Sequence, residues 1–182
     1  MKTFVFTKEN EEKFQEQAKK YPNLDAMMLP CLWLVQEQEN WVSPEAMIFI
    51  ANRLKKTPIQ VYEVATFYTM YNLKPIGTYH IEVCKTLSCM MMGANDLIKF
   101  MKDTVGIEPG ETSKDGKFHL SAVECLGACG GGPMFALNGD YHEKQSVESL
   151  KKLVFCLTFC RFVFEDKLIQ LIFTLNNNEL LI

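Results

Sequence analysis

The chain has 182 residues, of which 48% are hydrophobic and 23% charged, and a formal net charge of −3. These values indicate an ordinary globular protein of one domain or of a domain plus an extension. They argue against a nucleic-acid-binding protein, which would need clustered Lys and Arg for the phosphates.

The opening MKTFVFTKENEEKF lacks the long apolar core of a secretory signal and carries too many acids for a typical mitochondrial transit peptide. We therefore expect a protein of the reducing cytoplasm. Seven cysteines in that compartment indicate metal ligands, catalytic thiols or buried small side chains rather than disulfides.

Helices are predicted from about Lys8 to Tyr71, because apolar residues recur there at helical spacing. Ser43 is a predicted N-cap, with Pro44 at the first helical position. Thr57 and Gln60 form a predicted capping box for the next helix. The apolar stripes indicate core packing of a helical bundle.

The pattern changes period after Gly77 and predicts a small α/β unit. The predicted elements, in chain order, are a strand over Tyr79–Val83, a helix over Gly93–Val105, a strand over Phe118–Ala122, a hairpin over Met134–His142 and a last helix over Ser146–Leu153. The order strand, helix, strand, strand, strand, helix is that of a small thioredoxin-like fold, which by itself does not dictate function.

Four cysteines form two pairs where the strand patterns break into loops. Cys84 and Cys89 form C-x4-C, Cys125 and Cys129 form C-x3-C, and 35 residues separate the pairs. Four thiolates from two loops that leave neighbouring strands are what a cysteine-held iron–sulfur cluster requires. The arrangement suggests a carrier of single electrons.

Structural zinc also takes four thiolates from such pairs, so a zinc module stays an alternative. The second pair is rich in glycine, which lets a loop turn its backbone N–H groups towards an anionic cluster. A Rieske centre would need two histidines as ligands, and no histidine lies in a cysteine loop. A thioredoxin-type dithiol enzyme would need C-x-x-C, which the chain lacks.

Several longer segments carry a resemblance that is more specific than the cysteine spacing. They are WVSPEAM (Trp41–Met47), VYEVATFYTMY (Val61–Tyr71), GTYHIEVC (Gly77–Cys84), GET with the following DG (Gly110–Gly116), VECLGACGGGPM (Val123–Met134) and NGDYHE (Asn138–Glu143). With them, the stretch from Leu29 to about Glu143 resembles the thioredoxin-like [2Fe–2S] subunit of NADH:quinone oxidoreductase, complex I, termed E in bacteria and the 24-kilodalton subunit in mitochondria. That family commonly has Gly-Asn-Ala-Pro after the second pair, where this chain has Gly-Gly-Gly-Pro.

The resemblance implies that Cys84, Cys89, Cys125 and Cys129 hold one [2Fe–2S] cluster and that the chain has no catalytic residue of its own. It implies an electron-transfer subunit of NADH dehydrogenase (quinone), with FMN and NADH on a partner subunit. The other implied partners are iron–sulfur subunits of the peripheral arm, and the helical bundle is implied to meet the flavin-carrying partner. The equivalent subunit in the diaphorase module of an NAD-linked hydrogenase or formate dehydrogenase is the alternative.

The expected fold class is α+β, in three stretches. They are a helical bundle over 1–76, a thioredoxin-like [2Fe–2S] domain over 77–153 and an apolar tail over 154–182. Charged residues interrupt the tail, so we expect no membrane span. The expected location is peripheral, at the inner face of a bacterial plasma membrane or on the matrix side in a eukaryote.

Overall fold

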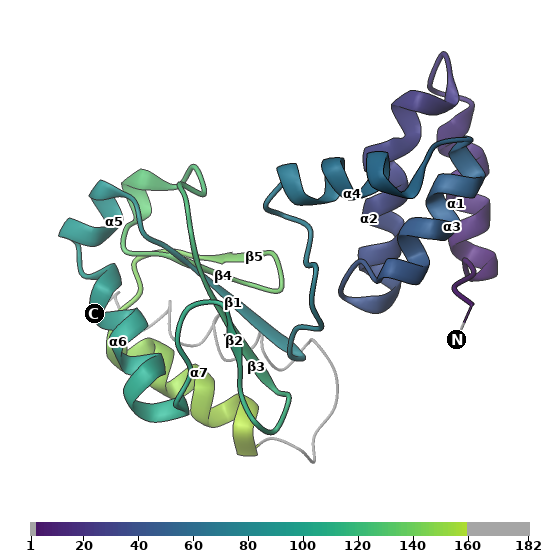
Figure 1. Cartoon of the computed structure of the whole chain (residues 1–182). Coiled ribbons are helices and arrows are strands. Elements are labelled where there is room, and N and C mark those ends of the chain that lie inside the picture. Colours follow the sequence, from purple (N-terminus) through teal and green to yellow (C-terminus); the bar gives the residue numbers. More distant parts are fainter. Residues whose placement is uncertain (1–2, 160–182) are drawn as a thin grey trace. The chain divides into compact units, whose positions relative to one another are not determined.

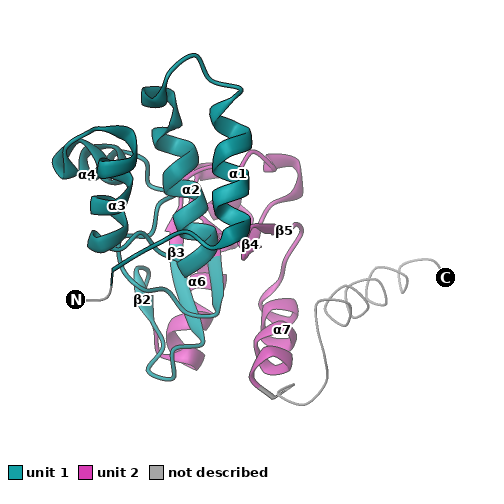
Figure 2. Ribbon diagram, turned by 90° about the vertical axis from the view of Figure 1, so that its right-hand side faces the viewer, with its two compact units in different colours: residues 1–81, 109–121 teal, residues 82–108, 122–182 magenta. Residues whose placement is uncertain are grey.

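The computed structural model describes residues 3–159 of the chain (Figure 1). Most of the predicted apolar tail, residues 160–182, lies outside the described residues. The chain divides into two compact units, each built from two segments (Figure 2). Unit 1 comprises residues 1–81 and 109–121, and unit 2 comprises residues 82–108 and 122–182.

The predicted helical bundle is present in unit 1. Its helices are α1 (Lys8–Ala18), α2 (Met28–Glu39), α3 (Pro44–Leu54) and α4 (Pro58–Phe67), with a 3-10 turn, η1 (Leu24–Met27), before α2. Both predicted start signals are confirmed. Ser43 Oγ accepts a hydrogen bond from the Ala46 N–H at 3.2 Å, and Thr57 and Gln60 form the capping box.

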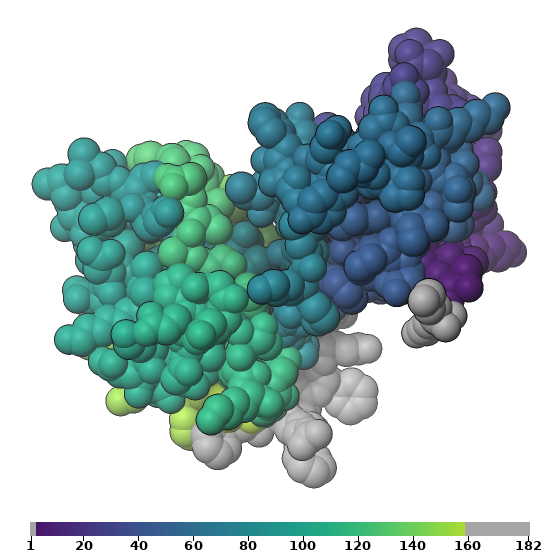
Figure 3. Space-filling view, viewed as in Figure 1, coloured from purple at the N-terminus to yellow at the C-terminus, as the bar shows by residue number. Residues whose placement is uncertain are grey.

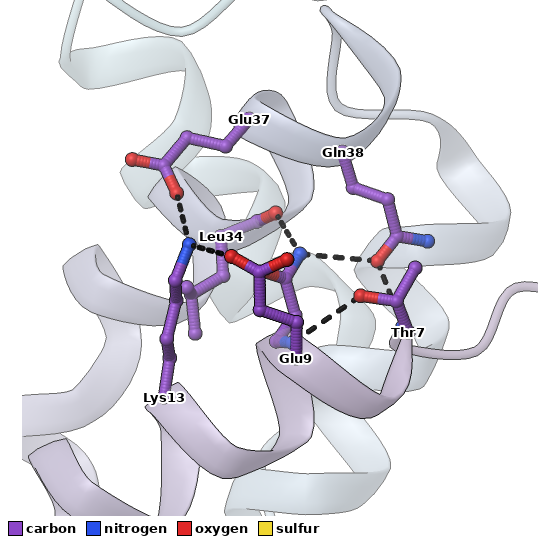
Figure 4. A network of polar contacts seen from close by, with 7 residues as sticks. Thr7, Glu9, Lys13, Leu34, Glu37 and Gln38 are labelled. Carbon is purple, nitrogen blue, oxygen red and sulfur yellow. Dashed lines mark hydrogen bonds and ion pairs between the residues drawn. The ribbon is translucent and has the colours of Figure 1, made fainter.

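Helices α1 and α2 are joined by a polar network as well as by apolar packing (Figure 4). The buried Asn10 side chain donates from Nδ2 to Leu34 O at 3.0 Å and to Gln38 Oε1 at 3.1 Å. Lys13 Nζ lies 2.9 Å from Glu9 Oε1 on the solvent side. Because Asn10 bonds the backbone of α2 directly, it fixes where α1 lies along its neighbour.

Helix α4 and the segment that follows it expose an apolar strip in unit 1. Figure 3 shows that this part of the chain, in blue to teal, lies at the surface. Its members are Ile59, Tyr62, Phe67, Tyr68, Met70 and Leu73. The opposite side of the helix is buried through Val61 and Ala65, so α4 is apolar on two sides. A helix of this kind indicates a surface that meets another protein.

A five-stranded sheet has the order β2-β3-β1-β4-β5. Its strands are β1 (Tyr79–Cys84), β2 (Glu111–Thr112), β3 (Phe118–Val123), β4 (Phe135–Leu137) and β5 (Asp140–His142). The pairs β2–β3 and β4–β5 are antiparallel. Tyr79 N donates to Lys117 O, and Lys85 N donates to Val123 O, so the partner numbers rise together and β1 runs parallel to β3.

The predicted hairpin and its turn are confirmed. Asn138 and Gly139 both have positive φ, 51° and 93°, which is the type I′ geometry that matches the twist of a two-residue hairpin.

The helices of unit 2 are α5 (Leu87–Met91), α6 (Ala94–Val105) and α7 (Val147–Phe159), and η2 (Cys129–Gly131) is a 3-10 turn. Helix α6 and its end at Gly106 are confirmed, and α6 packs beside α7 (Figure 1). The predicted end of the last helix at Leu153 is wrong, because α7 continues to Phe159. Helix α5 was not predicted, since five residues are too few to show a period.

The observed mixture of helices and a mixed sheet confirms the α+β class. The three-part division at 76/77 and 153/154 stays a prediction. None of the helices in residues 3–159 combines the length and the apolar composition that crossing a membrane takes.

Candidate metal centre

All four predicted ligand residues lie in unit 2. Cys84 is the last residue of β1, and Cys125 comes two residues after β3 ends. Because β1 and β3 are parallel neighbours, both chains leave the sheet at the same edge. Cys89 then lies on α5 and Cys129 begins η2. The fold therefore brings the two cysteine pairs together, as the predicted strand ends require.

The second pair is exposed and closely spaced. The Sγ atoms of Cys125 and Cys129 are 3.4 Å apart. Two thiolates that bind one tetrahedral metal at about 2.3 Å lie about 3.8 Å from each other, so a small adjustment lets this pair share one iron. The Gly127 N–H donates to Cys125 Sγ at 3.3 Å. Gly127 has φ of 85°, which a glycine adopts without strain and which turns this donor towards the sulfur.

The first pair is buried, since Cys84 and Cys89 are each 1% exposed. Their thiols share a hydrogen bond. Thr86 Oγ1 lies 3.1 Å from Cys84 Sγ and was not predicted as a functional residue. The available signal was its position two residues after Cys84, between the two cysteines of the first pair.

Two groups connect the pairs. The Leu126 backbone N–H lies near the Cys84 thiol and acts to lower its pKa. The Thr86 hydroxyl reaches the Cys125 thiol as well as that of Cys84. These contacts place both pairs around one small volume of unit 2.

Each pair contains one thiol whose pKa is lowered and one whose pKa is raised. Burial acts to raise the pKa of Cys84, but hydrogen bonds led by those from Thr86 outweigh it, so the net pKa falls. Burial, followed by the interaction with Cys84, raises the pKa of Cys89. The Gly127 N–H is the main cause of the lowered pKa of Cys125, and the hydrogen bond with Cys125 raises that of Cys129. Each pair thus offers one thiolate that can make the first bond to a metal.

The donor set fits a two-iron cluster. Such a cluster takes two thiolates on each iron, which is two pairs rather than four sulfurs around one ion. In residues 3–159, no group of three or more His, Cys, Asp or Glu has the geometry to hold a single metal ion. The other described cysteine whose thiol is fully buried, Cys31, lies in the core of unit 1, where burial raises its pKa to about 12.

The histidines of the sheet make other contacts. His80 Nε2 lies 2.9 Å from Ser121 Oγ, and His119 Nδ1 lies 2.8 Å from Thr112 Oγ1. The two rings are also in edge contact, with centroids 5.0 Å apart. These contacts give the two rings ordinary hydrogen-bonding roles in the sheet.

Comparison with known proteins gives consistent results at the level of sequence and of fold. The family model for thioredoxin-like [2Fe–2S] ferredoxins matches residues 14–158. The NADH-quinone oxidoreductase subunit termed E from Rickettsia prowazekii is 42% identical over 155 residues, which cover 84% of this chain and 88% of the relative. The same subunit from Rickettsia felis is 42% identical over 154 residues, 83% of this chain and 92% of the relative.

A solved NAD+-reducing [NiFe]-hydrogenase, in its H2-reduced state, superposes with a TM-score of 0.67 at 16% identity. The match covers 75% of this chain and 23% of the hydrogenase chain, so this chain spans about a quarter of that protein. At 16% identity, the superposition shows that the two proteins share a fold and shows nothing further.

Proposed function

Because this chain belongs to the thioredoxin-like [2Fe–2S] ferredoxin family, we propose that it is the electron-transfer subunit of an NADH-quinone oxidoreductase that bacteria term E. We propose further that Cys84, Cys89, Cys125 and Cys129 hold its [2Fe–2S] cluster. The names of the relatives support the assembly, since the matches cover most of their length and of this chain.

One observation carries the ligand assignment. Two cysteine pairs, 35 residues apart in sequence, leave parallel neighbouring strands at the same edge and meet within one unit. Random spacing of cysteines would not place both pairs at adjacent strand ends.

The bound cluster accepts and returns one electron at a time, whereas NADH gives up two together as hydride and needs a flavin for that step. The residues of this chain supply the surroundings. The fold keeps water away from the sulfurs of Cys84 and Cys89, and the Gly127 N–H and the Thr86 hydroxyl point at sulfur atoms. Donors at sulfur favour the more negative, reduced form and so help to set the potential.

The proposed partners are the flavin- and NADH-binding subunit and other iron–sulfur subunits of the peripheral arm. The exposed apolar strip of unit 1, from Ile59 to Leu73, supports a permanent partner because such a strip is costly in water. The proposed location is peripheral, on the cytoplasmic face of the membrane that carries the complex.

The test uses the full chain, purified without oxygen. We expect about two irons and two acid-labile sulfides per chain, a red-brown colour and an electron paramagnetic resonance signal after reduction. Cys125→Ser should abolish or sharply change that signal, and Cys31→Ala, which removes a buried thiol of unit 1, should leave it unaltered. A colourless protein that contains zinc would contradict the proposal, and an unchanged signal in Cys125→Ser would contradict the ligand set.

Isolation of the native assembly separates the two electron-transfer hypotheses. Co-isolation with proton-pumping membrane subunits is expected. Co-isolation with a nickel hydrogenase or a molybdenum formate dehydrogenase would indicate the diaphorase alternative instead.

A further inference from the structure

Gly131 makes room for the side chain of Glu143. An ideal Cβ on Gly131 would lie 2.6 Å from Cδ and 2.8 Å from Cβ of Glu143, and closer still to the carboxylate oxygen Oε2. Gly131 is buried, and its φ lies outside the left-handed region, so the backbone itself accepts any residue here. In this structure the neighbouring glutamate therefore fills the space that a side chain at 131 would take.

The backbone holds the two segments together on both sides of this contact. Lys144 N donates to Gly131 O at 2.6 Å, and Gln145 N donates to Pro133 O at 2.8 Å. The Gln145 side chain also donates from Nε2 to Glu143 O at 2.8 Å. The segment after β5 is thus bonded to the loop that carries Cys129, which keeps the Glu143 backbone next to Gly131.

Within the part of the chain that the structure describes, no basic side chain forms an ion pair with this carboxylate. Gly131 closes the same 3-10 turn that Cys129 opens. The Glu143 carboxylate therefore lies beside the turn that presents one of the proposed ligands.

We propose that the Glu143 carboxylate keeps the reduction potential of the cluster low, because its negative charge lies against the Cys129 turn. The proposal rests on the proposed function and its ligand set. A [2Fe–2S] centre with four thiolates has a formal charge of −2 when oxidised and gains one electron to reach −3. A nearby negative charge disfavours the second state more than the first, so it opposes reduction.

The experiment is a reductive titration of the full, cluster-loaded chain with dithionite as the electron donor, followed by paramagnetic resonance. Glu143→Gln keeps the shape of the side chain and removes its charge. We expect its reduced fraction at a fixed potential to rise about two- to fivefold relative to the parent, the size of an interaction between exposed charges. A tenfold rise would correspond to about 59 mV for one electron.

The matched control is Asp103→Asn, which removes an exposed carboxylate of the same unit in the last turn of α6. Asp103 is about 13 Å along α6 from the helix start that adjoins α5, so its variant should titrate like the parent. A second variant, Gly131→Ala, keeps the charge and pushes the Glu143 side chain out of its place. We expect a smaller shift in the same direction.

Parent-like titration of Glu143→Gln would overturn the proposal. If Glu143→Gln fails to retain the cluster, Gly131→Ala decides: a rise in the reduced fraction supports the proposal and no change overturns it. Loss of the cluster in both variants would also overturn it, because Glu143 would then serve assembly and not potential. Failure of the proposed function is distinct, since the parent chain itself would then contain no iron or labile sulfide.

Discussion

Replacing Thr86 by valine removes a hydroxyl 3.1 Å from Cys84 Sγ and keeps the branched shape of the side chain. A cysteine that binds metal is a thiolate and has no proton to give, so the hydroxyl must be the donor in the loaded protein. Cys84 is 1% exposed, and water cannot easily replace the lost donor. Thr86 makes no side-chain capping bond to α5, so its hydroxyl has no second structural task there.

The expected shift in reduction potential follows from the free energy of one hydrogen bond. A net contribution of about 0.5–1.5 kcal/mol, if it is gained mainly on reduction, corresponds to about 20–60 mV for a one-electron couple. Because the bond strengthens as the sulfur becomes more negative, its loss should lower the reduction potential of Thr86→Val by that amount.

Potentiometric titration of the full, loaded chain measures this shift directly. Thr86→Ser retains the hydroxyl and should stay near the parent value, and Ser88→Ala removes an exposed hydroxyl of α5 and should have no effect. A potential for Thr86→Val equal to that of the parent would refute the reasoning. An equal fall in Thr86→Ser would refute it too, since the cause would then be packing.

Three further predictions concern stability and are checked by urea unfolding of the full chain. Gly77→Ala should lose about 1–3 kcal/mol through overpacking, because its Cβ would lie 2.6 Å from the backbone oxygen of Lys117, whereas Gly130→Ala has open space and should be tolerated. Equal losses in the two variants would contradict this. Asn10→Ala should lower the free energy of unfolding by about 1–3 kcal/mol, because it removes both hydrogen bonds to α2. Glu12→Ala changes an exposed residue of the same helix and should lower it by under about 0.5 kcal/mol. Equal losses in the two variants would contradict the role of the polar network. Burial lowers the pKa of His80 to about 4 in the folded chain, so the unfolded chain takes up a proton first as the pH falls. The free energy of unfolding should therefore fall by about 2 kcal/mol from pH 6.5 towards pH 4, after allowance for the partial exposure of the ring. A parent-like pH slope in His80→Gln would contradict this.

The elements that the sequence predicts well are those whose signals are local. The caps at Ser43 and Thr57, the turn at Asn138 and the end of α6 at Gly106 all depend on residues within four positions of each other. The convergence of the cysteine pairs was also predictable, because each pair follows a run of alternating residues, and neighbouring strand ends bring such loops together.

The parts that could not be predicted depend on contacts between distant segments or on very short elements. Helix α5 has five residues, and β2 (Glu111–Thr112) has two, so neither shows a period. The place of Glu143 against Gly131 depends on how the chain after the hairpin returns to the cysteine loop.

Residues 109–121 belong to unit 1 although they lie between the two cysteine pairs, which both belong to unit 2. During synthesis, Cys89 is made 40 residues before Cys129, and residues 109–121 of unit 1 are made between them. A growing polypeptide on the ribosome offers only half of the proposed ligands until β3 has been made and has found β1. A cluster held by all four proposed ligands can therefore form only after the second half of unit 2 has been made.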